Sequence, residues 1–149
     1  MKLILKIVVF LSEGKIMSIK IYSCNDSRGV RPMWTAEEMG LSYETEMMPF
    51  PPRFLHKEYM DINILGTIPY LIDDEVEMTE SVAMCQYLVE KYGPTDLRVN
   101  SDEADYHHYL NWLAHSDATL TFPQTVVLRY TFQEIGVADK AAEGYRRWF

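Results

Sequence analysis

Cysteine is scarce in this chain, and its placement excludes two kinds of chemistry. The 149 residues include only Cys24 and Cys85, too few for the disulfide framework of a small secreted protein. The two do not form a Cys-x-x-Cys motif, so we exclude dithiol redox chemistry. We therefore expect a protein of the reducing cytoplasm.

An apolar segment long enough to cross a membrane is also missing. The first eleven residues are apolar apart from Lys2 and Lys6, but a transmembrane helix needs roughly 20 such residues. They resemble a weak signal sequence, yet no small-x-small cleavage site follows. Because Met17 comes two residues before the first alternating strand, we predict that residues 1–17 form an N-terminal extension, with Met17 as an alternative start.

Basic residues are in the minority, which excludes two classes of partner. Fourteen Lys and Arg face twenty-two Asp and Glu, and the net charge of -8 repels phosphate backbones and anionic membrane surfaces. The densest basic cluster is Arg146-Arg147, between Tyr145 and Trp148-Phe149, and it favours the start of an amphipathic helix. We expect neither a nucleic-acid nor a membrane partner.

The sequence also lacks a complete set of metal ligands at a suitable spacing. His108 and His115 would share one helix face two turns apart, next to His107, but no carboxylate or cysteine completes a credible set of ligands. We predict no metal site.

Apolar residues, by contrast, are abundant enough for a packed fold. Hydrophobic residues make up 48% of the chain and charged residues 24%, as in ordinary globular proteins. A chain of this length can bury roughly 70% of its unfolded surface. We expect one ordinary domain, or a small domain with part of a second.

The first half of the chain alternates strands and helices. Residues 19–22 alternate as a strand, and residues 30–39 form a helix that ends before Gly40, which suits a left-handed position past a helix end. Residues 42–47 form a second strand, and the helical crossover favours parallel pairing with the first. A proline-rich loop and a short helix at residues 53–61 follow.

The second half changes from a hairpin to helices. Residues 70–78 form a hairpin around a turn at Asp73-Asp74, and residues 82–92 carry a helical apolar stripe. Longer helices are predicted at residues 106–120 and 126–130. The predicted units are a first domain at residues 18–93, a linker at 94–100 and a helical segment at 101–149.

Three motifs in the first domain resemble one protein family. Trp34–Tyr43 has Glu-Glu and then Gly-Leu-x-Tyr at a helix end, Asn63–Pro69 reads Asn-x-x-Gly-x-x-Pro, and Met78–Ala83 contains Glu-Ser at a helix start. Together they resemble the glutathione S-transferase family, bacterial type. One departure is Ile64, which stands where the family loop has proline.

The resemblance implies an α/β thioredoxin-like N-terminal domain followed by a partial all-α C-terminal domain. The match of the second domain depends on its helical pattern and on Asn111-Trp112-Leu113. The family's second domain normally continues for several more helices beyond the point where this chain ends, at Phe149, so we expect a truncated domain. The family is also homodimeric, which makes a homodimer the expected assembly.

The resemblance also implies which residues bind glutathione. Pro69 is expected to follow a cis peptide bond, so that Ile68 presents its main-chain N–H and C=O to the cysteinyl part of the tripeptide, as an added strand would. Glu80 is expected to pair with the α-amino group of the γ-glutamyl part. Ser81 and the adjacent helix N-terminus suit the α-carboxylate of that same part.

Catalysis would need a donor that stabilises the glutathione thiolate at the start of the first helix. Ser27 is our first choice, because Asp26–Arg31 resembles the Asn-Ser-Arg-x-x-Arg run of bacterial members. Cys24 is the alternative, since some bacterial classes use cysteine there. Ser23 and Asn25 are the remaining candidates.

The predicted function is therefore conjugation of glutathione to a small electrophile in detoxification, with glutathione as a co-substrate and no cofactor. Tyr106, Trp112 and His115 on the predicted long helix could line the electrophile pocket, although such spacing is also typical of a core or an interface. Two alternatives remain: a truncated, non-catalytic glutathione-binding module, and glutathione-dependent thiol exchange at Cys24.

Overall fold

The computed structural model describes residues 19–131 and 139–146. The predicted N-terminal extension at residues 1–17 lies outside the described residues, and so do Arg147 and Trp148-Phe149.

A four-stranded mixed sheet forms the centre of the first domain. Its order is β2 (Tyr43–Met47), β1 (Ile19–Ser23), β3 (Tyr70–Asp73) and β4 (Val76–Met78). β1 pairs with β2 in parallel and with β3 antiparallel, and β3 pairs with β4 as a hairpin. The predicted α/β thioredoxin-like fold is confirmed, including the parallel pairing across the first helical crossover.

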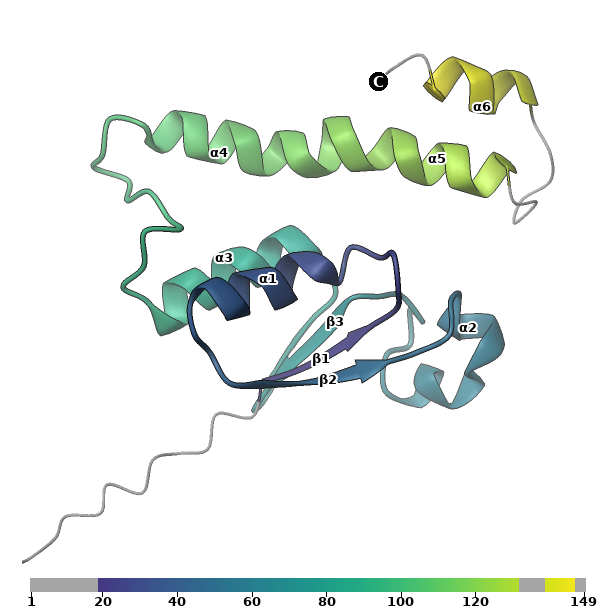
Figure 1. Cartoon of the computed structure of the whole chain (residues 1–149), viewed down its shortest axis with the longest axis horizontal. Helices are drawn as coiled ribbons and strands as arrows, with labels where there is room; N and C mark the ends of the chain where they lie inside the picture. Colours follow the sequence, from purple (N-terminus) through teal and green to yellow (C-terminus); the bar gives the residue numbers. More distant parts are fainter. Residues whose placement is uncertain (1–18, 132–138, 147–149) are drawn as a thin grey trace, which may run out of the picture.

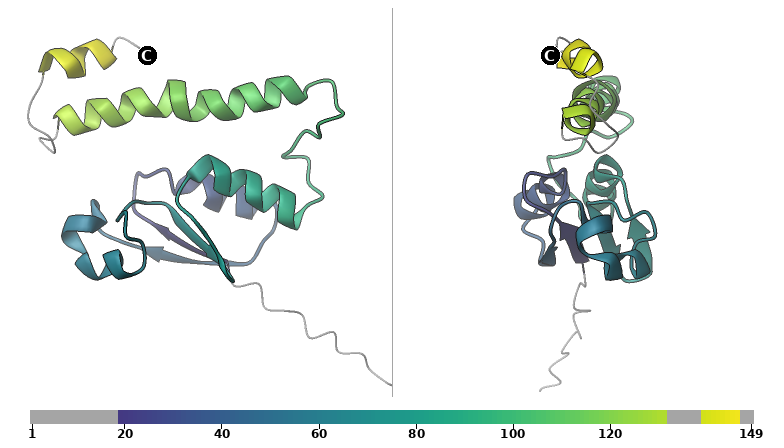
Figure 2. Two further views of the ribbon diagram at one scale, coloured as in Figure 1. Left: turned by 180° about the vertical axis from the view of Figure 1, so that it is seen from behind. Right: turned by 90° about the vertical axis from the view of Figure 1, so that its right-hand side faces the viewer.

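Two helices, α1 (Val30–Glu38) and α3 (Ser81–Tyr92), pack against each other on one face of this sheet (Figures 1 and 2). Alternation along β1 turns Ile19 and Ile21 toward them. The first core cluster lies between these helices and the sheet: Ile19, Ile21, Ala36, Leu71, Met84 and Leu88.

A second core cluster fills the other side of β1 and β3, and it contains three tyrosines. The ring of Tyr22 packs at a tilt against those of Tyr59 and Tyr70, and Tyr59 is completely buried. Tyr59 belongs to the 3-10 helix η1 (Lys57–Asp61), which follows the short helix α2 (Pro52–Leu55).

The single helix predicted at residues 53–61 is therefore wrong. His56 separates α2 from η1, because its backbone at φ -144° and ψ 76° is not helical. Both elements lie beyond the carboxyl ends of β1 and β2 (Figure 1).

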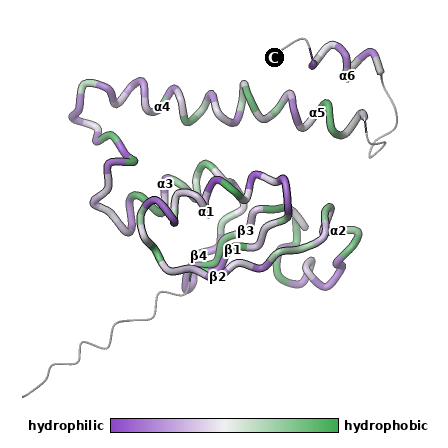
Figure 3. The backbone as a smooth tube through the Cα atoms, in the orientation of Figure 1, coloured by the Kyte–Doolittle hydropathy of each residue, from purple (hydrophilic) through white to green (hydrophobic). Residues whose placement is uncertain are grey.

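The second segment is a long helical rod that lies over α1 and α3 (Figures 1 and 2). It consists of α4 (Tyr106–His115), a π-helix η2 (Ser116–Thr121) and α5 (Phe122–Thr131). Apolar and polar positions intermix along the rod (Figure 3), and Trp112, Phe122 and Leu128 remain exposed.

The last helix, α6 (Asp139–Arg146), packs against α5. The sequence predicted a helix that begins at Arg146-Arg147, and the structure corrects this, because α6 already covers Asp139–Arg146. Arg146 lies in the last helical turn, where a cation interacts favourably with the helix dipole. Within residues 19–131 and 139–146, no helix is both long and apolar enough to span a bilayer.

A buried carboxylate joins the end of β3 to the end of α3. Asp73 was predicted in the hairpin turn, but it is the last residue of β3 and only 1% exposed; the turn lies at Asp74-Glu75. Its Oδ2 accepts hydrogen bonds from Tyr87 at 2.9 Å, Lys91 at 2.7 Å and Tyr92 at 2.5 Å. Burial alone would raise the pKa of Asp73, but these three donors outweigh it and lower the pKa.

Asp73 is therefore expected to stabilise the fold in a pH-dependent way. Asp73→Ala should lower the free energy of unfolding by about 2 kcal/mol at neutral pH, because three donors lose a shared charged acceptor. Since the folded pKa is lowered, the contribution is fully present above roughly pH 4 and is lost as the pH falls through the folded pKa.

Urea unfolding of both proteins at neutral and acidic pH measures this effect. Glu75→Ala, in the exposed turn of the same hairpin, is the control and should change stability by less than about 0.5 kcal/mol. A difference between wild type and Asp73→Ala that did not shrink on acidification would contradict the assignment.

Candidate functional site

The predicted site residues meet at one edge of the sheet. Tyr22 of β1 pairs with Tyr70 of β3, so the end of β1 lies beside Pro69. Ser23 pairs with Met47, which brings the end of β2 to the same edge. Met78 of β4 pairs with Leu71, which brings the start of α3, three residues later, to this edge as well. The loop from β1 to α1 and the start of α3 therefore adjoin the Ile68-Pro69 loop.

The loop before β3 is held by two buried side chains. The Ile68-Pro69 peptide bond is cis, as the resemblance implies. One residue earlier, the carbonyl of Thr67 accepts hydrogen bonds from the Tyr59 hydroxyl at 2.8 Å and from Nδ2 of Asn63 at 2.9 Å. This explains physically why the Asn-x-x-Gly-x-x-Pro motif begins with Asn63.

Ile68 has the main-chain groups that the predicted binding mode requires. Its side chain packs against the tyrosine cluster, which fixes the residue in place. Among the described residues, no hydrogen bond involves its main-chain N–H or C=O. An extended peptide can pair with such groups at the end of a strand.

The start of α3 presents a carboxylate and a buried hydroxyl. Glu80 is the N-cap residue and is exposed, and in the described part of the chain its carboxylate has no hydrogen-bond partner. Ser81, at the first helical position, is only 4% exposed. Its Oγ accepts a hydrogen bond of 3.1 Å from Nη1 of Arg31 in α1. The sequence motif contained Arg31, but sequence reasoning gave it no role.

Ser27 lies in the turn that leads into α1. Its hydroxyl donates to the carbonyl of Cys24 at 2.8 Å and accepts from the N–H of Gly29, the N-cap residue of α1, at 3.2 Å. The Ser23 hydroxyl lies 3.3 Å away, yet Ser23 is fully buried. Among the hydroxyl candidates, Ser27 is therefore the accessible one.

Cys24 is buried, and its environment opposes ionisation. Its Sγ donates to the carbonyl of Pro49 at 3.6 Å, and only 3% of the residue is exposed. Burial raises the pKa of this thiol to about 11, although the main-chain N–H of Met48 partly offsets the effect. A catalytic cysteine needs the opposite shift.

A hollow of about 550 Å³ opens beside Ser27. Its lining combines the polar turn after β1 with apolar side chains of α1 and β2. This lining does not include Tyr106, Trp112 or His115. The suggestion from the sequence that these three residues line the electrophile pocket is therefore not supported at this hollow. The lining residues are Cys24, Asn25, Asp26, Ser27, Val30, Met33 and Met47.

The sequence did not predict a role for Arg53, a cationic residue close to the loop before β3. The Cβ of Arg53 lies against Gly66, so that a Cβ added at Gly66 would come within 2.7 Å of it. Gly66 has φ +56°, a conformation that glycine adopts readily. The Nε of Arg53 is buried without a hydrogen-bond partner among the described residues. No pattern around Arg53 could reveal this, because the contact depends on how α2 folds back.

No cluster of three or more potential ligands that could hold a metal ion occurs within the described ranges. The residues described above provide main-chain groups, hydroxyls and charges of both signs.

Comparison with known proteins places this arrangement in a family. Residues 17–90 match the model of the glutathione S-transferase N-terminal domain. Glutathione S-transferase 3 of Schizosaccharomyces pombe is 31% identical over 102 residues, which cover 68% of this chain and 42% of that protein.

Two solved structures share the fold over most of the chain. The glutathione transferase URE2P6 of Phanerochaete chrysosporium, solved with oxidized glutathione, is 28% identical with a TM-score of 0.73 and covers 93% of this chain. The nitrogen regulation fragment of the yeast prion protein Ure2p has a TM-score of 0.74 at 23% identity and covers 91% of this chain. This chain spans 64% and 63% of those two chains, respectively. Through its first domain, the chain belongs to the glutathione S-transferase family.

Proposed function

We propose that this protein binds glutathione and transfers its thiolate to a small apolar electrophile. The observation that carries the proposal is the main chain of Ile68, which has no hydrogen-bond partner among the described residues and lies at the same sheet edge as Glu80 and Ser81. The cysteinyl part of the tripeptide would pair with Ile68 as a short added strand.

The γ-glutamyl end would bind at the start of α3. The exposed carboxylate of Glu80 pairs with the α-amino group, and the Ser81 hydroxyl with the adjacent helix N-terminus binds the α-carboxylate. Family membership and the complex of the Phanerochaete protein with oxidized glutathione support this ligand.

The second carboxylate of glutathione, on its glycyl residue, requires another cation. We assign this role to Arg53, whose Nε has no hydrogen-bond partner among the described residues and whose Cβ lies against Gly66. A guanidinium binds a carboxylate strongly because it can donate two parallel hydrogen bonds.

Ser27 would stabilise the thiolate during transfer. Its hydroxyl now donates to the carbonyl of Cys24, and rotation would direct the same proton to the glutathione sulfur. The thiolate then forms a sulfur–carbon bond while the leaving group departs with its electron pair. The apolar side chains of Val30, Met33 and Met47 in the adjacent hollow favour an apolar electrophile.

Glutathione is a co-substrate in this proposal, and no resident cofactor takes part. The cytoplasmic location, the homodimer and a detoxification role stay predictions.

A non-catalytic binding module is the second candidate function. It is favoured by the likeness of this fold to the nitrogen regulation fragment of Ure2p. The two functions share the glutathione site and differ only in turnover, so an assay with a panel of electrophiles separates them.

Glu80→Ala is expected to weaken glutathione binding by about tenfold or more, because a charge-assisted hydrogen bond to the α-amino group is lost. Isothermal titration calorimetry measures the effect. Glu75→Ala removes an exposed glutamate of the preceding hairpin and serves as the matched control. Equal affinity of the wild type and Glu80→Ala would contradict the assigned role of Glu80.

Ser27→Ala is expected to lower kcat by roughly 10- to 100-fold and to raise the pKa of bound glutathione by about 1–2 units, because one hydrogen bond to the thiolate is lost. The pH dependence of conjugation to chlorodinitrobenzene reports both changes. Ser42→Ala, at an exposed loop serine, is the control. An unchanged profile would move the role to Asn25, which also lines the hollow.

Cys24 is expected to be unreactive in the folded protein. With a pKa of about 11, only about one thiol in a thousand is ionised at pH 8, so alkylation by iodoacetamide should become fast only above about pH 10 or after unfolding. Peptide mapping of the alkylated protein distinguishes Cys24 from Cys85. Fast alkylation of native Cys24 at neutral pH would restore thiol exchange as a function.

A further inference from the structure

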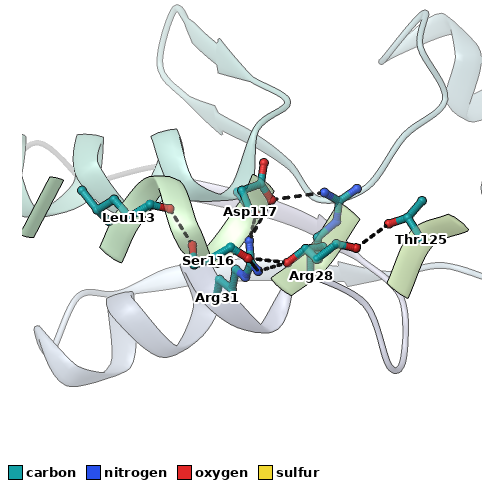
Figure 4. A network of polar contacts seen from close by, with 8 residues as sticks. Arg28, Arg31, Leu113, Ser116, Asp117 and Thr125 are labelled. Carbon is teal, nitrogen blue, oxygen red and sulfur yellow. Dashed lines mark hydrogen bonds and ion pairs between the residues drawn. The ribbon is translucent and has the colours of Figure 1, made fainter. Parts of the chain in front are cut away.

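One guanidinium connects the glutathione site to the second helical segment. Nη1 of Arg31 donates to Oγ of Ser81 at 3.1 Å and to Oδ1 of Asp117 at 3.2 Å. Its Nη2 donates to the carbonyl of Ser116 at 3.0 Å and to the hydroxyl of Thr121. The contacts thus reach from the start of α3, through α1, to the π-helix η2 (Figure 4).

The π-helix supplies three of the four hydrogen-bond partners described for this guanidinium. A π-helix is rare and is frequently found at functional sites. Here a single segment presents a carbonyl, a carboxylate and a hydroxyl to Arg31, from Ser116, Asp117 and Thr121. Figure 4 shows Asp117 between Arg28 and Arg31, and Arg28 contacts the carboxylate more loosely, at 3.5 Å.

The direction of the Arg31–Ser81 hydrogen bond has a consequence for the ligand. A guanidinium can only donate, so the Ser81 oxygen must accept, and its single O–H proton is left to donate elsewhere. The nearby positive charge also makes that proton a stronger donor. A carboxylate at the start of α3 is the acceptor that suits it best.

We propose that Arg31, held by η2, is a positioning residue that orients the Ser81 hydroxyl toward the α-carboxylate of glutathione. This inference rests on the proposed glutathione site and adds that the second helical segment sets the affinity of that site. Arg31 acts through Ser81, and Asp117 acts through Arg31.

The first experiment compares ligands that differ only in the recognised group. Arg31→Gln should weaken glutathione binding about tenfold in calorimetry, since a charge-assisted contact is lost. It should leave the affinity for an analogue lacking the γ-glutamyl α-carboxylate unchanged. Arg98→Gln is the matched control, because Arg98 has a similar side-chain exposure, 28% against 25%, and pairs with Glu90 away from the site.

The second experiment tests whether Arg31 acts through Ser81. In a double-mutant cycle, Arg31→Gln should have no further effect on glutathione affinity in the Ser81→Ala background. An equal loss in both backgrounds would overturn the positioning role, and so would an equal loss for both ligands.

If Arg31→Gln fails to fold, a variant in η2 still tests the positioning role. Asp117→Ala leaves Arg31 intact and should weaken glutathione binding about threefold, again without affecting the analogue. Unchanged affinity in Asp117→Ala would overturn the proposed link to η2. Failure of the wild-type protein to bind glutathione would refute the proposed function itself, which separates the two results.

Discussion

The pairing of β1 with two neighbours of opposite direction is the constraint on which the rest of the structure depends. β2 runs parallel to β1, and β3 runs antiparallel to it. Consequently the ends of β1 and β2 and the beginning of β3 meet at one edge, where the turn before α1, the cis-Pro69 loop and the start of α3 come together. Buried Ile19, Ile21 and Leu71 keep this register, because a slip by one residue would turn them to the opposite face.

The candidate site uses little specialised side-chain chemistry. Its central element is the main chain of Ile68, fixed by the packing of its own side chain and by the hydrogen bonds of Tyr59 and Asn63 to Thr67. In our proposal, the charged contacts to the ligand lie at its two ends, through Glu80 and Arg53. The proposed ligand, glutathione, has the peptide backbone and the charged termini that groups of this kind can bind.

Burial distinguishes the residues that could act on the thiol. Ser23, Cys24 and Ser27 occupy one short turn and look equivalent in the sequence. In the fold, Ser23 is fully buried and burial raises the pKa of the Cys24 thiol to about 11, whereas Ser27 is partly exposed beside the hollow. The order of preference among them therefore follows from solvent access and not from residue type.

The sequence by itself determined the family, the thioredoxin-like fold and the order of strands and helices, because hydrophobic periodicity and turn residues act over a few neighbouring positions. Motifs of the same short range predicted Ile68, Pro69, Glu80 and Ser81 as ligand-binding residues. Only the tertiary structure decided the break at His56, the place of Asp73 in β3, the burial of Cys24, and the contacts of Arg31. Arg31 and Asp117 are 86 positions apart, and their contact exists only because α1 and η2 pack together, which no local pattern encodes.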